Sequence, residues 1–117
     1  MVNKIKEARK LLRKQDKEWS IAIRARDKKC MVCGSKIRLN AHHLIPREIR
    51  QFRHDLRNGI TLCPKHHRFS FECSAHQNPI MFLAHLKRDF PNIKLDINTM
   101  LAERQWESWY KLSYEVS

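Results

Sequence analysis

Cysteine and histidine residues recur at metal-ligand spacing in the middle of this chain. Cys30 and Cys33 are separated by two residues, and about thirty residues later Cys63 and His66 repeat the same separation. Thiolates and imidazoles are the ligands that zinc takes in closed tetrahedral sites. If a hairpin joins the two pairs, they predict one structural zinc site.

Two other interpretations of these cysteines remain open. Cys73 and His76 are also separated by two residues, so they compete with Cys63 and His66 for the second half of the site. Alternatively, Cys63 and Cys73 are small buried residues without a ligand role. A disulfide framework is less favoured, because we expect a reducing intracellular compartment, where cysteines serve metal or redox chemistry.

A second set of residues interleaves with the first. His42 and His43 are adjacent, Asn58 follows after fourteen residues, and His67 follows after eight more, which gives the pattern His-His-x14-Asn-x8-His. Histidine, with an ordinary pKa near ~6.5, can take a proton from water at neutral pH. The other interpretations of this set are a second structural zinc site and histidines that only pack.

Together the two sets resemble the HNH endonuclease family, and within it the small phage-type nucleases. The resemblance covers about residues 19–71, roughly half of the chain. It is carried by Trp19, Arg26-Asp27, Cys30-x2-Cys33-Gly34, Ala41-His42-His43-Leu44-Ile45-Pro46, Asn58-Gly59-Ile60-Thr61-Leu62-Cys63 and His66-His67. The family often has Cys-x2-Cys-His where this chain has Cys63-x2-His66-His67, which exchanges a zinc thiolate for an imidazole.

The resemblance implies a ββα-metal fold, in which two strands and a helix hold one catalytic divalent ion. It implies that His42 and His67 bind this ion, which would be Mg, Mn or another transition metal. His43 would be the general base, and Asn58 would brace the connecting loop and orient His43. An ion held by only two imidazoles keeps open positions for water and a phosphate oxygen.

The elements that must position these residues can be read from local patterns. Apolar residues at helical spacing predict a basic helix over residues 4–17, and residues 19–27 predict a second, short helix with Ser20 as a possible N-cap. We expect strands within 36–44 and 60–62, with Asn58-Gly59 as a turn, and a helix over 65–71.

Two further helices are expected beyond the motif, over residues 80–90 and from Asn98 or Thr99 to about residue 112. Their aromatic residues Trp106, Trp109 and Tyr110 are expected in the core. The fold class is therefore α+β: a ββα-metal core with a zinc knuckle, flanked by N- and C-terminal helices. We expect one domain, 1–117, made of the basic helix (1–18), the core (19–71) and a helical part (72–117).

The chain has a formal net charge of +12, which favours a polyanionic partner, nucleic acid before an anionic membrane surface. Residues 1–53 hold 16 basic and 5 acidic residues, so the excess lies in the first half. Candidate DNA contacts are Lys10, Arg13, Lys14, Arg47, Arg50, Arg53 and Arg57.

The sequence thus predicts a metal-dependent endonuclease that nicks or cleaves double-stranded DNA. The competing class is a zinc-stabilised nucleic-acid-binding module without catalysis; a membrane-surface protein would leave the histidines unexplained. No apolar stretch is long enough for a membrane span or a signal peptide, so we expect a cytoplasmic location. The resemblance adds phage packaging proteins as partners and the host cell as the compartment.

Overall fold

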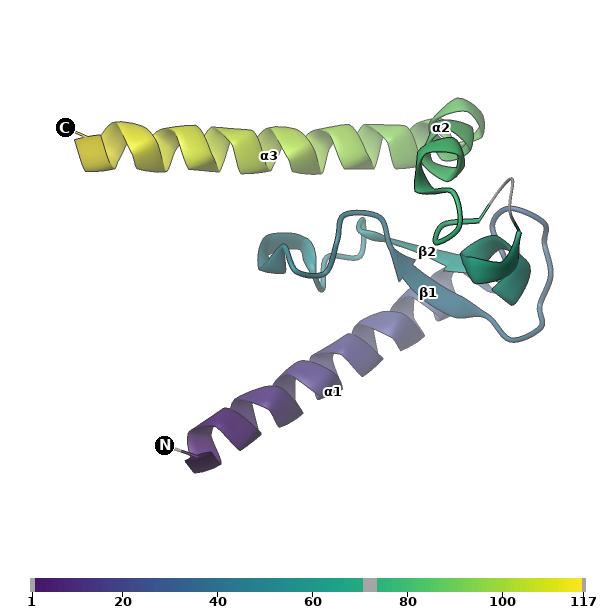
Figure 1. Ribbon diagram of the computed structural model, residues 1–117, viewed down its shortest axis with the longest axis horizontal. Helices are drawn as coiled ribbons and strands as arrows, with labels where there is room; N and C mark the ends of the chain where they lie inside the picture. Colours follow the sequence, from purple (N-terminus) through teal and green to yellow (C-terminus); the bar gives the residue numbers. More distant parts are fainter. Residues whose placement is uncertain (1, 71–73, 117) are drawn as a thin grey trace.

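The computed structural model describes residues 2–70 and 74–116, with side chains described as far as residue 104. Within these residues, the chain forms α1 (Val2–Asp27), β1 (Asn40–His43), β2 (Gly59–Leu62), α2 (Pro79–Asp89) and α3 (Pro91–Val116). The two strands pair antiparallel, with His43 opposite Gly59 and Asn40 opposite Leu62. The predicted α+β class is confirmed, and Figure 1 shows the sheet between the two long helices.

α1 is one continuous helix, so the prediction of two separate helices at this end was wrong. Ser20 lies inside the helix and caps nothing, because no glycine or proline interrupts the chain between residues 17 and 21. Trp19 and Ile23 are buried one turn apart, where α1 packs on the sheet. Residues 2–11 are exposed and extend away from the sheet (Figure 1).

The first strand, β1, is shorter than the sequence patterns predicted. Arg38 has a positive φ of 52°, which is not a strand conformation, so the strand begins only at Asn40. β2 is buried throughout. Ile60 and Leu62 of β2 pack with Phe82 and Leu86 of α2 in the main apolar cluster. The sheet therefore carries the core on the side that α2 covers.

α2 and α3 follow each other almost without a break. Asn78 caps α2 by accepting a hydrogen bond from the amide of Met81, and the helix ends at Asp89, before Pro91. Pro91 also starts α3, so the predicted start at Asn98 or Thr99 was wrong. Proline suits a first helical position, where an N–H would have no partner. Thr99 instead lies inside the helix, where its Oγ1 donates to Leu95 O.

Between β2 and α2 the chain makes a single π-type turn over Lys65–Phe69, where an ordinary helix was predicted. The amide of Ser70 donates to Lys65 O at 2.7 Å, which widens the turn by one residue. The aromatic residues Trp106, Trp109 and Tyr110, and also Cys73, lie outside the residues whose side chains are described.

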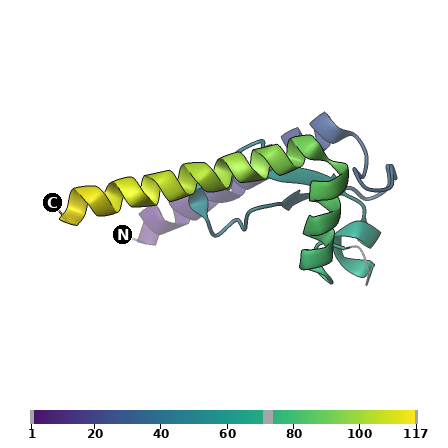
Figure 2. The ribbon, with the colours of Figure 1, turned by 90° about the horizontal axis from the view of Figure 1, so that it is seen from above.

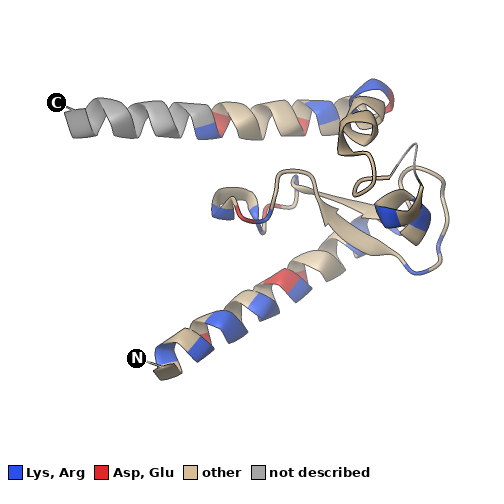
Figure 3. Cartoon of the chain, viewed as in Figure 1, with Lys and Arg blue, Asp and Glu red and all other residues tan. Residues whose placement is uncertain are grey.

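The outer ends of α1 and α3 point to the same side of the sheet in two perpendicular views (Figures 1 and 2). Lysine and arginine recur along the length of α1 (Figure 3). None of the helices in the described ranges combines the length and apolar character that a membrane span requires.

Candidate metal and nuclease site

Three cysteines and one histidine converge between the sheet and the loops on either side of it. The Sγ atoms of Cys33 and Cys63 are 3.7 Å apart, and His66 Nδ1 lies 3.3 Å from Cys63 Sγ and 3.7 Å from Cys30 Sγ. All four ligand atoms lie within 4.8 Å of one another. The structure thus brings together the four residues that the spacing predicted.

These separations fit one zinc ion. Zinc bonds of ~2.3 Å to sulfur and ~2.1 Å to nitrogen give tetrahedral edges of about 3.8 Å between two sulfurs and about 3.6 Å between sulfur and nitrogen. Burial opposes the thiolate of Cys30, but backbone amides, that of Cys63 first, lower its pKa overall. The cluster can therefore hold a structural zinc. His76 is not part of this cluster, and Cys73 lies outside the described residues.

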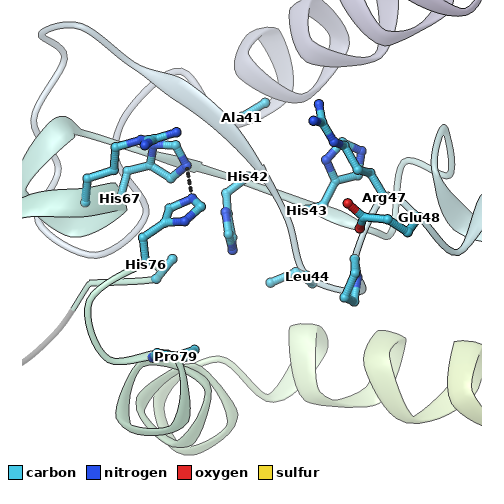
Figure 4. A pocket seen from close by; sticks show the side chains of 12 residues that line it. Ala41, His42, His43, Leu44, Arg47, Glu48, His67, His76 and Pro79 are labelled. Atoms are coloured by element: carbon cyan, nitrogen blue, oxygen red, sulfur yellow. Dashed lines mark hydrogen bonds between the residues drawn. The ribbon is translucent and has the colours of Figure 1, made fainter.

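A second cluster consists of His42, His67 and His76, whose ligand nitrogens also lie within 4.8 Å of one another. His42 comes from β1, His67 from the π-type turn and His76 from the loop before α2. The Nε2 atoms of His67 and His76 are 3.0 Å apart (dashed line in Figure 4). Around one ion with bonds of about 2.1 Å, neighbouring ligand atoms lie about 3.0 Å apart in octahedral geometry and about 3.4 Å apart in tetrahedral geometry.

The electrostatics keep these three imidazoles neutral. Burial lowers the pKa of His42 to about 3, and the neighbouring His67 and His76 add to the effect. Burial and His76 lower the pKa of His67 to about 4 in the same way. Burial also lowers the pKa of His76. Near neutral pH the rings therefore offer lone pairs, which is the form that binds a divalent ion.

His43 points away from this cluster, because successive side chains of a strand lie on opposite faces (Figure 4). Its ring stacks on Trp19 with 3.9 Å between ring centroids and 7° between planes. Its Nε2 donates to Arg53 O at 2.9 Å. A carbonyl can only accept, so in the neutral ring the proton is assigned to Nε2 and Nδ1 keeps a lone pair. Burial lowers the pKa of His43 and favours this neutral form.

Asn58 is fully buried and bonds to the loop between the strands. Its Oδ1 accepts from the amide of Ile45 at 2.6 Å, and its Nδ2 donates to Ile45 O and Phe52 O. The hydrogen-bond partner of His43 is Arg53, the residue after Phe52, and not Asn58 itself. Asn58 thus contacts the loop that supplies the acceptor for His43.

The four arginines that were predicted to grip phosphates fall into two groups. Arg53 pairs with Asp16, and Arg57 pairs with both Asp55 and Glu103. Arg47 and Arg50 are exposed, and no ion pair involves them within the described ranges. Lys10, Arg13 and Lys14 are exposed on the projecting part of α1. Of these four arginines, Arg47 also lines the cleft that contains the histidines.

A cleft of about 570 Å³ unites these groups. Its lining includes His42, His43, His67, His76, Arg47 and Arg68. The cleft therefore brings together three candidate ion ligands, an imidazole directed away from them, two cationic side chains and the carboxylate of Glu48.

A protein-family model described as HNH endonuclease matches residues 30–69. Over these residues the chain is similar to the HNH endonuclease family. The family indicates a nuclease in general, and hence a nucleic acid as substrate. The HNH segment contains both histidine pairs and Asn58, but it stops short of His76 and begins after Trp19. Comparisons with curated proteins and with solved structures gave no match.

His76 is a candidate ligand of the second cluster that the sequence offered only as an alternative member of the zinc site. Its spacing from Cys73 was compatible with the zinc site, and that spacing is its main local signal. In the structure its amide donates to His67 O at 3.0 Å, and the amide of Ala75 donates to His66 O. These backbone bonds bring His76 to His67 instead.

Proposed function

We propose that the protein is a metal-dependent DNA endonuclease that hydrolyses phosphodiester bonds, built on a ββα-metal core with a structural zinc. One observation carries this proposal: the cleft joins a three-histidine ligand cluster to a neutral His43 whose Nδ1 is unbonded in the described residues. The competing function is a zinc-stabilised nucleic-acid-binding module, which would need the cysteines but not this second cluster.

His43 is the proposed general base. Its Nδ1 accepts a proton from the attacking water, while the bond from Nε2 to Arg53 O holds the ring and stabilises the charge that the ring gains. A pKa lowered by burial keeps the base unprotonated at neutral pH. Asn58 acts on His43 indirectly in this proposal. It holds Ile45 and Phe52 by hydrogen bonds, and these residues belong to the loop whose Arg53 carbonyl accepts the bond from His43.

His42, His67 and His76 are the proposed ligands of the catalytic divalent ion, Mg, Mn or another transition metal. His76 extends the two-ligand set that the sequence predicted. A divalent ion bound there would neutralise charge on the phosphate and stabilise the departing 3′ oxygen. Three imidazoles leave coordination positions for phosphate and water. Arg47 and Arg50 are the proposed phosphate contacts beside the scissile bond.

Double-stranded DNA is the proposed substrate, because the excess positive charge is concentrated in the first half of the chain. Lys10, Arg13 and Lys14 on α1 would contact the phosphate backbone without reading sequence. The resemblance to phage-type nucleases extends the proposal to DNA processing near phage packaging proteins in the cytoplasm of a host cell.

The test is cleavage of supercoiled plasmid by the zinc-loaded protein, with Mg or Mn titrated in. We expect nicked or linear product from the parent. His43→Ala should lose a factor of about 10²–10⁴ in rate while zinc content, circular dichroism and DNA binding stay unchanged. His85→Ala is the matched control, since this histidine lies on α2 and pairs with Asp89.

Two outcomes would contradict the proposal. A parent protein that binds DNA but does not cut it at any concentration of divalent ion would favour the binding module. Equal cleavage rates for His43→Ala and the parent would remove His43 from the role of base.

A further inference from the structure

Three consecutive residues of the loop between the strands are tied to α1. The guanidinium of Arg53 forms two bonds to the carboxylate of Asp16, at 2.8 and 2.7 Å. His54 Nε2 lies 2.7 Å from the same carboxylate. Trp19 Nε1 donates to Asp55 O at 3.0 Å. The loop is thus fastened to one face of the helix, since Asp16 and Trp19 are one turn apart.

The same two helix residues control both restraints on the ring of His43. Trp19 covers one face of the imidazole, at 3.9 Å between centroids and nearly parallel. The acceptor of its Nε2–H is the carbonyl of Arg53, the residue whose side chain Asp16 holds. Trp19 thus limits the plane of the ring, and Asp16 limits the position of its hydrogen-bond acceptor.

Asp16 is less exposed than the acidic residues Glu7 and Glu18 of the same helix. α1 is predominantly basic, and a carboxylate there weakens attraction to a polyanion. Most of the surrounding positions are exposed, whereas the Asp16 side chain is 29% exposed and its partner Arg53 only 15%. Asp16 thus makes its contacts within the protein, through Arg53 and His54.

We propose that Asp16 and Trp19 are positioning residues for the general base. They act through Arg53 and by stacking, and they hold the Nε2–H tautomer of His43 with Nδ1 directed into the cleft. The proposal rests on the proposed function, and it makes α1 a part of the active site and not only a DNA-binding arm. Neither residue lies within the matched HNH segment.

The experiment measures kcat and KM for DNA cleavage at saturating divalent ion. Asp16→Asn removes the charge that holds Arg53, and we expect kcat to fall on the order of tenfold or more with KM unchanged or lower. Glu7→Gln is the matched control: it removes the same charge from an exposed position of the same helix, and its kcat should equal that of the parent. Asp16→Glu, which keeps a carboxylate, should recover part of the loss.

A double-mutant cycle separates positioning from a general structural effect. In the His43→Ala background there is no base to orient, so Asp16→Asn should change the residual rate by less than about twofold. Trp19→Phe, which keeps an aromatic ring but removes the bond to Asp55 O, should also lower kcat only when His43 is present. If circular dichroism shows that Asp16→Asn is unfolded, Trp19→Phe provides the test instead.

A second measurement does not depend on cleavage. The ring ¹⁵N shifts of His43 should indicate the Nε2–H tautomer in the parent and a mixture of tautomers in Asp16→Asn. A full kcat in Asp16→Asn, or the same fold-loss with and without His43, would overturn the inference while leaving the endonuclease intact. If the parent does not cut DNA, the proposed function fails, and an unchanged tautomer in Asp16→Asn would then reject the positioning role separately.

Discussion

At the scale of single residues, local backbone geometry places the two members of each histidine pair in different surroundings. His42 and His43 are consecutive on a strand, so their rings lie on opposite faces. His66 and His67 are consecutive on the π-type turn, so their side chains leave it in different directions. His66 therefore joins the cysteines, while His67 joins the three-histidine cluster.

His76 gives the first prediction. His76→Ala should raise the concentration of Mn or Mg needed for half-maximal cleavage at least on the order of tenfold, because one of three proposed ligands is removed. Excess ion should restore part of the rate, since the base is untouched. The measurement is a metal titration of cleavage rate, with His85→Ala as the control. An unchanged half-maximal concentration would remove His76 from the ion site.

Sequence spacing was sufficient for part of the candidate site. The Cys30-x2-Cys33 and Cys63-x2-His66 pairs each lie within one turn, so their geometry is local and could be predicted. The position of His76 depends on backbone bonds between residues 75–76 and 66–67, and the stacking of Trp19 on His43 joins residues far apart in sequence. Such contacts are determined by packing, which no local pattern contains.

Asp16 makes a prediction about pH. The bonds from Arg53 are the main cause that lowers the pKa of Asp16 from 3.8 to about 2 in the folded protein. A depressed folded pKa adds stability above the unfolded pKa, and this stability disappears as pH falls from about 4 to about 2. Parent and Asp16→Asn should therefore differ by on the order of 1–2 kcal/mol in unfolding free energy near pH 6, and by progressively less below pH 4.

Chemical denaturation of both proteins, with zinc content matched at each pH, measures this difference. A difference that stays constant down to pH 2.5 would show that the charge of Asp16 does not contribute to folding.

At the scale of elements, the approach of α1 to β2 depends on Gly59. A Cβ atom at this position would lie 2.6 Å from Trp19 Cζ2 and 2.7 Å from Ile23 Cδ1. Real Cβ contacts are not that short, so α1 can lie this close to the strand only because residue 59 has no side chain. The same contact brings Trp19 to the ring of His43, which pairs with Gly59 across the sheet.

Gly59→Ala should therefore destabilise the protein by about 1–3 kcal/mol through overpacking and should also lower the cleavage rate. Adding Ile23→Val, which removes Cδ1, should recover part of the stability but less of the rate, since the clash with Trp19 remains. Thermal unfolding and plasmid cleavage test both parts. Parental stability in Gly59→Ala would mean that α1 can move away from β2 at little cost.

The zinc cluster makes the second prediction at this scale. Cys63→Ser should lose bound zinc and cooperative unfolding together, because zinc binding is coupled to folding of the loops that carry the ligands. Cys73→Ser is the matched control and should keep its zinc. Metal analysis and calorimetry decide between them, and a larger loss in Cys73→Ser would exclude Cys63 as a ligand.

Element boundaries were less predictable than element types. Pro91 marks both the end of α2 and the first turn of α3, and its spacing alone indicates only the first of these. Ser20 is as compatible with a helix interior as with a cap, and the buried face of α1 continues past it through Trp19 and Ile23. In both places the packing of the helix, and not the residue at the boundary, decides how far the helix runs.

At the scale of the whole molecule, the positive charge of the chain lies partly on a helix that extends away from the cleft. Both long helices extend to the same side of the sheet, and lysines and arginines recur on α1 from its outer end toward the sheet (Figure 3). A cation on an extended arm can reach phosphates at a distance from the cleft. We therefore expect α1 to contribute affinity that depends on salt and not on sequence.

Lys10→Ala with Lys14→Ala should weaken binding to duplex DNA at low salt. It should reduce the slope of log affinity against log salt by about 0.9 for each phosphate that α1 no longer neutralises. The control is Lys87→Ala with Lys94→Ala, which removes equal charge from α2 and α3. Fluorescence anisotropy between low and physiological salt measures the slopes. Equal slopes for the two double variants would mean that α1 has no particular role in binding phosphates.

The adjacency of His66 and His67 has a thermodynamic consequence. One ring completes the zinc cluster and the other enters the three-histidine cluster, so an ion in either cluster stabilises the same turn of the chain. Linkage is reciprocal: if zinc raises the affinity for the catalytic ion by some factor, the catalytic ion raises the affinity for zinc by the same factor. The zinc concentration would then determine what fraction of the molecules can bind the catalytic ion. When zinc is scarce, a given concentration of the catalytic ion would occupy fewer molecules.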